Sequence, residues 1–315
     1  MRFNNVTIKA VSSYVPKKIV TNSDIEHGGV STTDAWIFNK LGINERRIVD
    51  DELPSDLAYQ ATKKLLDDNK INKEDIDLII VSTSSPEQIA PPTACILHNK
   101  LRLEGNIPAF DINAVCSGFV YAITVGASFI SGGNYQNVLI VSTEAYSRYT
   151  NWSDRHCVFF GDGAGALLLS NSNQNGVFSE LSADGSGTGM TGFKMPTDGV
   201  FEMRGKEVWD QAIKVLPDSI KSVLNNSKTG LSEIKMLIPH QPSINILKLI
   251  AEDVGLPMSK VKTVMDRYGN IASSSIPIAL DDAIKNGEVV KGDKIILTGI
   301  GSGWSWGSVI ISYKD

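Results

Sequence analysis

The run Ile76-Asp-Leu-Ile-Ile-Val-Ser82 and the later run Ile234-Lys-Met-Leu-Ile-Pro-His240 decide how this chain folds. Both are short apolar stretches with polar ends, and such stretches are typical of strands buried on both faces of a mostly parallel sheet. Further runs of this kind are Val138-Leu-Ile-Val-Ser142, Ala166-Leu-Leu-Leu169 and Lys294-Ile-Ile-Leu-Thr298. The sequence therefore predicts buried strands at these positions.

Helical segments lie between these runs. Residues 55–69 carry apolar side chains at the spacing of one helix face, and residues 244–255 and 276–287 repeat the pattern. Strands that alternate with helices indicate an α/β fold.

The order of these segments repeats along the chain. Three pairs correspond: 76–82 with 234–240, 110–116 with 264–270, and 137–143 with 293–299. Two similar halves, residues 1–170 and 171–315, would explain this order. Coincidence among short strand-forming strings is the alternative.

The composition is that of a globular protein of 315 residues, 42 % of them hydrophobic, which excludes a disordered chain. The net charge of −5 argues against a nucleic-acid or anionic-membrane surface. The first residues lack the pattern of a secretory signal, and no apolar run approaches the ~20 residues of a membrane span. Three cysteines do not make a disulfide framework. We therefore expect a cytoplasmic protein.

Cys116 stands where a strand-like run gives way to a helical one, in Phe110-Asp-Ile-Asn-Ala-Val-Cys-Ser-Gly-Phe119. At a helix N-terminus the macrodipole and the unpaired backbone N–H groups favour thiolate over thiol. We therefore take Cys116 as a candidate nucleophile with a lowered pKa. Cys95 and Cys157 have no such position and are interpreted as small buried hydrophobic residues.

His240 and Asn270 stand at comparable junctions. His240 ends an apolar strand, at the rim where α/β folds place their sites. Asn270 lies in a turn that leads into a helix, where an isolated asparagine would be read as a helix cap. A thiolate needs a neighbouring imidazole and amide to act as a catalyst, so the three residues together indicate one site.

Across its whole length the sequence resembles the β-ketoacyl-acyl carrier protein synthase III family of the thiolase superfamily. The matching strings, in order, are Thr33-Asp-Ala-Trp36, Gly42-Ile-Asn-Glu-Arg-Arg47, Cys116-Ser-Gly-Phe119, Asp154-Arg155, Phe160-Gly-Asp-Gly-Ala-Gly-Ala166, His240-Gln241, Gly269-Asn-Ile-Ala-Ser-Ser-Ser275 and Gly307-Ser308. The resemblance implies a five-layered αβαβα sandwich made of two pseudo-duplicated halves.

It also implies an acyltransferase. Cys116 would take an acyl group from acyl-CoA, and malonyl-acyl carrier protein would then lose CO₂ and condense with that group to a 3-oxoacyl product. His240 and Asn270 would hold the malonyl thioester oxygen, and the backbone N–H groups of Cys116 and Ser302 would form a second oxyanion hole. The resemblance implies no cofactor and no metal.

Further residues match the family's substrate-binding positions. Trp36 and Arg155 would sandwich the CoA adenine, and Met203 and Trp209 would line the pantetheine tunnel. Ala90 takes the place of a bulky aromatic residue that the family contributes to the neighbouring subunit's acyl pocket. This implies a homodimer with an altered pocket.

Two departures bear on the substrate. The usual His-Gln-Ala-Asn is His240-Gln-Pro-Ser243 here. The basic patch that docks the carrier protein in fatty acid initiation is replaced; the aligned positions hold Asp210, Asn245, Glu252 and Asp253. Acidic residues would repel an acidic carrier protein. Either these changes are drift within a fatty-acid-initiating enzyme, or the chain is a specialised synthase that uses malonyl-CoA or another acceptor.

Two other classes stay open. The order Cys116, His240, Asn270 also describes papain-like hydrolases, although their Cys-Gly-Ser-Cys-Trp surroundings are missing. A non-catalytic scaffold would have been free to lose these three residues, and all are present.

Overall fold

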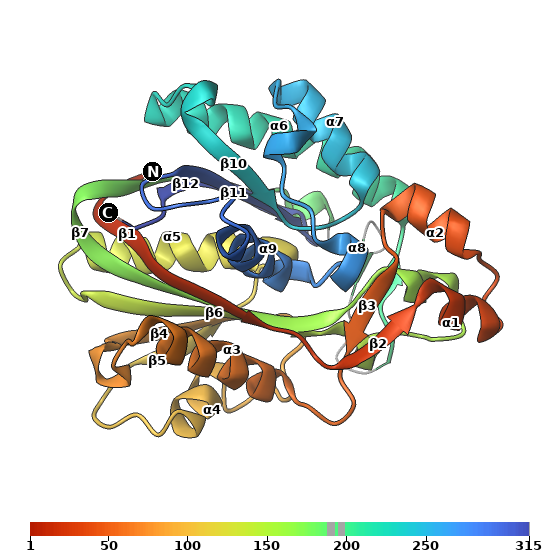
Figure 1. Cartoon of the computed structure of the whole chain (residues 1–315), viewed down its shortest axis with the longest axis horizontal. Helices are drawn as coiled ribbons and strands as arrows, with labels where there is room; N and C mark the ends of the chain where they lie inside the picture. The colour runs from red at the N-terminus through yellow and green to blue at the C-terminus, as the bar shows by residue number, and fades with distance from the viewer. Residues whose placement is uncertain (188–192, 195–198, 315) are drawn as a thin grey trace.

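A computed structural model of the chain describes residues 1–187, 193–194 and 199–314. Figure 1 shows five stacked layers, in which two sheets alternate with three layers of helices, so the expected αβαβα sandwich is confirmed. One outer layer and its sheet comprise α6 (Gly205–Ser227), α7 (Ile244–Val254), β10 (Ile234–Pro239), β11 (Lys294–Gly301) and β12 (Ser305–Ser312). The central layer comprises α5 (Gly118–Ser131) and α9 (Ser275–Lys285). The other sheet and its outer helices comprise β1 (Arg2–Tyr14), β4 (Leu78–Ser82), β5 (Ala109–Ile112), β6 (Asn137–Ala145), β7 (Asp162–Ala183), α3 (Pro54–Asn69) and α4 (Thr93–Lys100).

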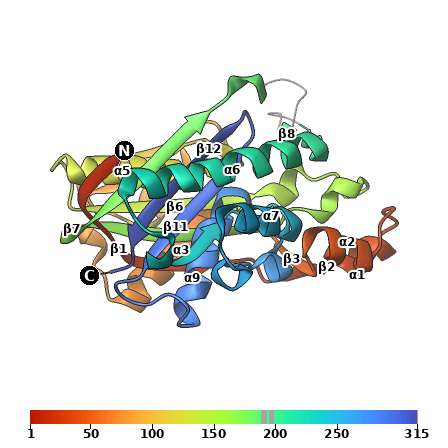
Figure 2. The same ribbon diagram turned by 90° about the horizontal axis from the view of Figure 1, so that it is seen from above.

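Smaller elements gather at one end of the sandwich in Figure 1. They are β2 (Lys18–Thr21), α1 (Asn22–His27), α2 (Asp34–Leu41), β3 (Glu45–Ile48) and α8 (Met265–Tyr268). The short strands β8 (Phe193–Lys194) and β9 (Glu202–Met203) pair with each other ahead of α6. Seen from above, α6 and α7 lie side by side over the sheet of β11 and β12 (Figure 2).

The strands form one continuous hydrogen-bonded path, β10-β11-β12-β7-β6-β4-β5, with β1 paired to β7. The expectation of a mostly parallel sheet was wrong. In the described chain β4 pairs in parallel with β5 and β6, and β10 with β11, whereas β7 pairs antiparallel with β1, β6 and β12. Antiparallel strands can be buried on both faces as well, so apolar runs do not reveal strand direction.

The predicted strands and helices form for the expected reason. All five residues of β4 are buried. Leu57, Ala61 and Leu65 on α3 have no exposed surface, because α3 packs on the neighbouring strands β1, β6 and β7 of the same sheet. α5 is apolar on all sides because it lies between two sheets (Figure 1). None of the helices in the described part of the chain has both the length and the apolar character to cross a membrane.

The proposed division at residue 170 stays a prediction. That residue lies inside the long strand β7, which joins both layers of strands. Of the repeated segments, 76–82 and 234–240 hold β4 and β10, whereas 110–116 holds β5 and 264–270 holds α8.

Both central helices begin in the same way. α5 follows the 3-10 turn Val115–Ser117, and α9 follows the 3-10 turn Ala272–Ser274. The first residue of each turn has a positive φ, 49° at Val115 and 42° at Ala272, which is uncommon outside glycine. Cys116 belongs to the first turn, and Asn270 lies just before the second.

Candidate active site

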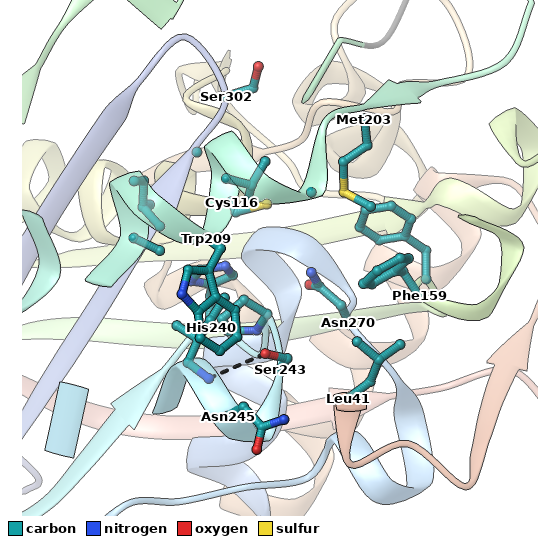
Figure 3. A pocket seen from close by; sticks show the side chains of 18 of the residues that line it. Leu41, Cys116, Phe159, Met203, Trp209, His240, Ser243, Asn245, Asn270 and Ser302 are labelled. Carbon is teal, nitrogen blue, oxygen red and sulfur yellow. Dashed lines mark hydrogen bonds between the residues drawn. The ribbon is translucent and has the colours of Figure 1, made fainter. Parts of the chain in front are cut away.

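A cavity of about 310 Å³ brings the three candidate residues together. Cys116, His240 and Asn270 all line it, from three different elements of the sandwich (Figure 3). His240 and Asn270 are only 3 % and 7 % exposed, so they lie at its inner end. The exposed Lys40 and the half-buried Asn245 also line the cavity and mark its mouth.

The turn that carries Cys116 is supported from the facing half of the molecule. A side chain at Gly301 would come within 2.5 Å of the Ala114 carbonyl and 3.1 Å of the Cys116 nitrogen, so only glycine lets β11 approach this closely. The Ser117 hydroxyl donates to the Ala114 carbonyl at 2.7 Å and lies 2.9 Å from the Ser305 hydroxyl. Gly301 at the end of β11 therefore allows close packing of the backbone against the turn that carries Cys116.

The expected low pKa of Cys116 is not found. Burial raises the pKa of the thiol above its usual value, and the carboxylate of Glu144 raises it further. The effect of the helix N-terminus on this pKa is outweighed by burial, because a thiolate removed from water is costly. No cation contributes to lowering the pKa of the thiol. The resting residue is a thiol.

His240 is a neutral imidazole. Burial lowers its pKa to about 3. Its backbone N–H donates to the Thr298 carbonyl at 2.9 Å, which fixes the end of β10 beside β11. The Nδ1 atom is buried without a hydrogen-bond partner, so a proton placed there would have no acceptor. The tautomer with the proton on Nε2 is therefore favoured.

The amide of Asn270 is oriented by the chain that follows it. Its Oδ1 accepts the backbone N–H of Ala272 at 2.9 Å, and only an oxygen can fill that position. Its backbone is held by Phe159 and Gly161, with N–H···O distances of 2.9 and 3.1 Å. The amide nitrogen is thus left as the donor at the cavity.

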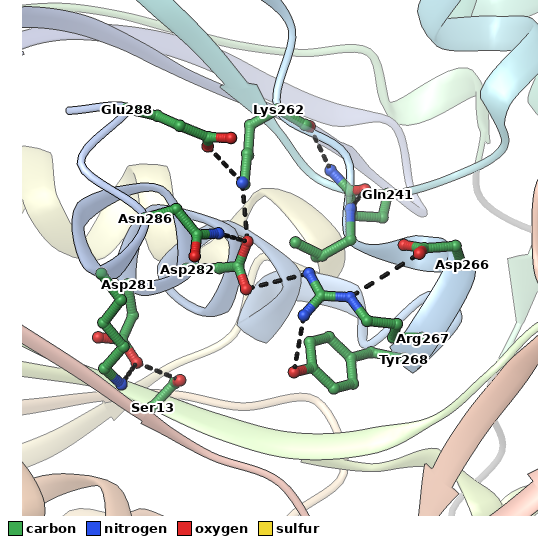
Figure 4. Close-up of polar contacts among 12 residues, drawn as sticks. Ser13, Gln241, Lys262, Asp266, Arg267, Tyr268, Asp281, Asp282, Asn286 and Glu288 are labelled. Carbon is green, nitrogen blue, oxygen red and sulfur yellow. Dashed lines mark hydrogen bonds and ion pairs between the residues drawn. The ribbon is translucent and has the colours of Figure 1, made fainter.

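A polar network fastens the segment between His240 and Asn270 (Figure 4). The fully buried Gln241 donates to the carbonyls of Pro239 and Lys262 and accepts the N–H of Val264. The Lys262 ammonium, 9 % exposed, pairs with Asp282 at 2.7 Å and with Glu288. Gln241 and Lys262 together tie the end of β10, just before His240, to α9.

The remaining substrate-binding candidates divide into two groups. Met203, Trp209, Ser302 and Trp36 line the same cavity, and the Arg155 guanidinium lies 3.8 Å over the ring of Trp36. Ala90 is exposed and is not among the lining residues.

The four positions aligned with the family's docking patch are less negative than the sequence suggests. Asp210 pairs with Lys206, and Asp253 pairs with Lys221 at 2.6 Å. Asn245 donates to the carbonyl of Lys40 at 3.0 Å, and Glu252 is exposed. The departure at Ser243 has a local role, because its hydroxyl caps α7 by accepting the N–H of Ile246 (Figure 3).

Sequence reasoning missed Glu144 and misjudged Cys95. Glu144 is fully buried near Cys116, and a charged residue two positions after the run Val138-Leu-Ile-Val-Ser142 was a signal for it. Cys95 is exposed, not buried, because its place on α4 points outward, whereas Cys157 is buried as expected.

Known proteins resemble this chain along nearly its whole length. The family model for 3-oxoacyl-[acyl-carrier-protein (ACP)] synthase III matches residues 110–185, and the model for its C-terminal part matches residues 224–313. The β-ketoacyl-[acyl-carrier-protein] synthase III of Clostridium acetobutylicum is 38 % identical over 98 % of this chain and 99 % of its own.

Solved structures agree with this likeness. The 3-oxoacyl-[acyl-carrier-protein] synthase III of Aquifex aeolicus is 37 % identical, with a TM-score of 0.93 over 98 % of this chain and 100 % of its own. The priming β-ketosynthase of the R1128 polyketide pathway is 26 % identical, with a TM-score of 0.93 over 99 % of this chain and 97 % of its own.

Proposed function

Since the chain belongs to the β-ketoacyl-[acyl-carrier-protein] synthase III family, we propose that it transfers an acyl group from acyl-CoA to Cys116 and condenses it with a malonyl thioester. The observation that carries this proposal is the common cavity of Cys116, His240 and Asn270, in which two neutral donors face a thiol. The proposed reaction uses no cofactor and no metal.

Acylation comes first. The Cys116 sulfur attacks the thioester carbon, the bond from that carbon to the CoA sulfur breaks, and the thiol proton leaves with CoA. The developing oxyanion would accept hydrogen bonds from the backbone N–H groups of Cys116 and Ser302, and such donors stabilise charge that appears only in the transition state. Since the resting group is a thiol, proton removal accompanies the attack.

Condensation follows. The malonyl carboxylate leaves as CO₂, and the electron pair passes into the thioester enolate, whose oxygen would accept hydrogen bonds from His240 Nε2 and Asn270 Nδ2. The enolate carbon attacks the Cys116 thioester, and the released thiolate regains a proton from solvent. A neutral imidazole suits this role, because it can donate to the enolate without being deprotonated at neutral pH.

In the proposed CoA subsite, the side chains of Arg155 and Trp36 already stack on each other. A spacing of 3.8 Å between the Arg155 guanidinium and the Trp36 ring is already one stacking contact. An adenine ring can enter only after the two side chains separate. We therefore propose that CoA binding moves Arg155 away from Trp36.

The acceptor could be a carrier protein or malonyl-CoA. The pairing of Asp210 and Asp253 with lysines removes much of the repulsion expected for an acidic carrier protein, and this supports malonyl-acyl carrier protein. The four aligned positions nevertheless carry no basic residue, and this favours the second candidate, a specialised synthase that uses malonyl-CoA or another acceptor.

We further propose a cytoplasmic homodimer. β5 is the last strand of its sheet and has no partner on its outer side within the described chain, with half-buried Phe110 and Ile112. Ile89, 87 % exposed, stands beside Ala90 on the loop between β4 and α4. A free edge and an exposed apolar loop favour pairing with a second copy, in which Ala90 would reach the partner's acyl pocket.

Intact-protein mass spectrometry with a panel of acyl-CoA thioesters tests the proposal. We expect a single acyl adduct that is absent from Cys116→Ala and is discharged by malonyl-acyl carrier protein. Discharge by malonyl-CoA alone would establish the specialised reading. No adduct with any acyl-CoA would reject the condensing function, and cleavage of casein would point to a hydrolase.

A further inference from the structure

Glu144 lies at the end of β6 as a fully buried carboxylate. It accepts hydrogen bonds from the Ser85 hydroxyl at 2.6 Å, the Ser273 hydroxyl at 2.9 Å, and the hydroxyl and backbone N–H of Ser84 at 3.0 and 3.2 Å. These hydrogen-bond partners are all neutral donors. Burial raises the pKa of Glu144 to about 7, because these hydrogen bonds only partly replace the lost hydration.

These donors come from the segments that surround the site. Ser84 and Ser85 begin the loop that follows β4, and Ser273 belongs to the turn Ala272–Ser274 at the start of α9. The carboxylate therefore ties two separate loops to the end of β6. A buried charge without a cation is expensive, which argues for a role beyond filling space.

The link to the chemistry runs through Ser273. The N–H of its neighbour Ala272 holds Oδ1 of Asn270 at 2.9 Å, and this contact decides which end of the amide is the donor. Ala272 has a φ of 42°, so its peptide stays in place only if the turn is held from outside. The bond from Ser273 to Glu144 supplies such a hold one residue further along.

The nucleophile has separate support. The turn Val115–Ser117 is fastened by Ser117 to Ala114 and Ser305 and is packed against Gly301, and none of these contacts involves Glu144. The two turns also contact each other. Since the hydrogen bonds of Val115–Ser117 do not use Glu144, displacing the turn Ala272–Ser274 should still disturb Asn270 more than Cys116.

We propose that Glu144 is a positioning residue for the condensation step, which acts through Ser273 and Ala272 to keep the amide nitrogen of Asn270 aimed at the enolate oxygen. The proposal rests on the function proposed above and goes beyond it by separating the two half-reactions. Loss of the Glu144 hold slows condensation and leaves acylation intact, because acylation does not use Asn270.

Two neighbouring serines provide a matched test. Ser273 and Ser274 are both fully buried and both lie within hydrogen-bond distance of the Ser142 hydroxyl, at 2.6 and 3.0 Å, but only Ser273 reaches Glu144. The variants are Ser273→Ala, Ser274→Ala and Glu144→Gln. For each, the rate of Cys116 acylation is followed by mass spectrometry, and condensation is followed separately from enzyme that has already been acylated.

We expect Ser273→Ala and Glu144→Gln to slow condensation by about 10- to 100-fold, the scale of a misplaced catalytic group. The KM for the malonyl thioester should stay near its wild-type value, since the lost interaction belongs to the transition state. Acylation should stay the same or become faster, because a negative charge near the thiol is lost in Glu144→Gln. Ser274→Ala should resemble the wild type in both steps.

Three outcomes would overturn the proposal. One is wild-type condensation in Ser273→Ala. Another is an equal loss of acylation and condensation, which is what a merely structural role gives. The third is a condensation defect of the same size in Ser274→Ala. If Glu144→Gln does not fold, the two serine variants decide alone. If the wild-type protein forms no acyl adduct, the proposed function is rejected, and the inference about Glu144 is rejected with it.

Discussion

The turns Val115–Ser117 and Ala272–Ser274 have the same shape and carry different chemistry. Each opens a central helix, and each starts with a non-glycine residue at positive φ. The first presents the Cys116 thiol to the cavity. At the corresponding place the second carries the fully buried Ser273, whose hydroxyl is bonded to Glu144. The same backbone conformation thus exposes the nucleophile in the first turn and, in the second turn, holds the segment that follows Asn270.

The difference lies in what each turn packs against. The turn Val115–Ser117 packs against Gly301 at the end of β11, and its other side faces the cavity. The turn Ala272–Ser274 packs against β6 and is hydrogen-bonded to the carboxylate of Glu144. Residues held at positive φ cost about 1–3 kcal/mol each and persist only where neighbours hold them. Both turns satisfy this condition, by backbone packing in one case and by hydrogen bonds in the other.

The largest expected effect breaks the first turn. Cys116→Ala should abolish acyl-adduct formation in mass spectrometry, whereas Cys95→Ala should acylate as the wild type does, because Cys95 is exposed and does not line the cavity. The double variant Cys116→Ala with Ser273→Cys should stay inactive, since the second turn faces Glu144. Acylation by that double variant would show that the two turns are interchangeable.

The next effect removes the donor beside the second turn. Asn270→Ala should lower the rate of condensation by about 10²–10³-fold, as expected for one oxyanion donor, while the acyl adduct still forms. Asn286→Ala, at the far end of α9, is the control. If Asn270→Ala condenses normally, the assignment of the enolate donors is wrong.

Breaking the network behind His240 should cost stability. Lys262→Met leaves Asp282 without its ammonium and should lower the free energy of unfolding by about 2–3 kcal/mol, somewhat less than for a fully buried pair because Glu288 is 41 % exposed. The exposed pair Lys63–Asp67 is the control, and Lys63→Met should unfold with the wild type in urea.

This loss should depend on pH. Burial alone would raise the pKa of Asp282, but hydrogen bonds from Lys262 and Arg267 outweigh burial and hold it below its usual value. A lowered carboxyl pKa stabilises the fold above the unfolded pKa, and this contribution disappears as the pH falls through the lowered value. The difference between Lys262→Met and the wild type should therefore shrink in acid. A constant difference down to pH 3 would contradict the pairing.

Relieving the strain of the second turn should have a smaller effect. Ala272→Gly accepts the φ of 42° without penalty and should raise the free energy of unfolding by at most about 1 kcal/mol, because glycine also gains freedom in the unfolded chain. Val115→Gly should not stabilise, since it also deletes the valine side chain. Urea titration of both variants compares the strain of the two turns.

The last prediction is that His240 shows no ionisation near neutral pH. Burial holds the pKa of His240 at about 3, so its ring should remain neutral from pH 5 to pH 8 and its NMR signals should not titrate there. His27, one of the four histidines of the chain, is exposed and serves as the solvent-accessible comparison. A midpoint near 6.5 for His240 would require a different account of the enolate donors.

Much of the fold was predictable because it follows from local patterns. The apolar runs at residues 76–82 and 234–240 are β4 and β10, and the helix-period segment at 55–69 is α3. Strand direction was not predictable, because the same runs suit parallel and antiparallel pairing. The meeting of Cys116, His240 and Asn270 in one cavity agrees with the expectation that the three residues form one site, although Asn270 follows α8 and not a strand.

The electrostatics of the site were beyond the sequence. The depth of Cys116 reverses the expected direction of its pKa shift, and the carboxylate of Glu144 beside it comes from a strand about 28 positions further along the chain. The exposure of Cys95 likewise depends on how α4 is rotated against its sheet. These properties arise from contacts between distant segments, which periodicity does not encode.

In the proposed CoA subsite, the stack of Arg155 on Trp36 would compete with the incoming adenine for the same space. A ligand that needs the open arrangement binds with an apparent affinity reduced by the fraction of molecules that are open. Under this proposal the same contact would re-form when CoA departs, so closure would favour product release as much as it opposes binding. The exchange of CoA at this proposed subsite would then depend on how fast the Arg155 guanidinium leaves and regains the Trp36 ring.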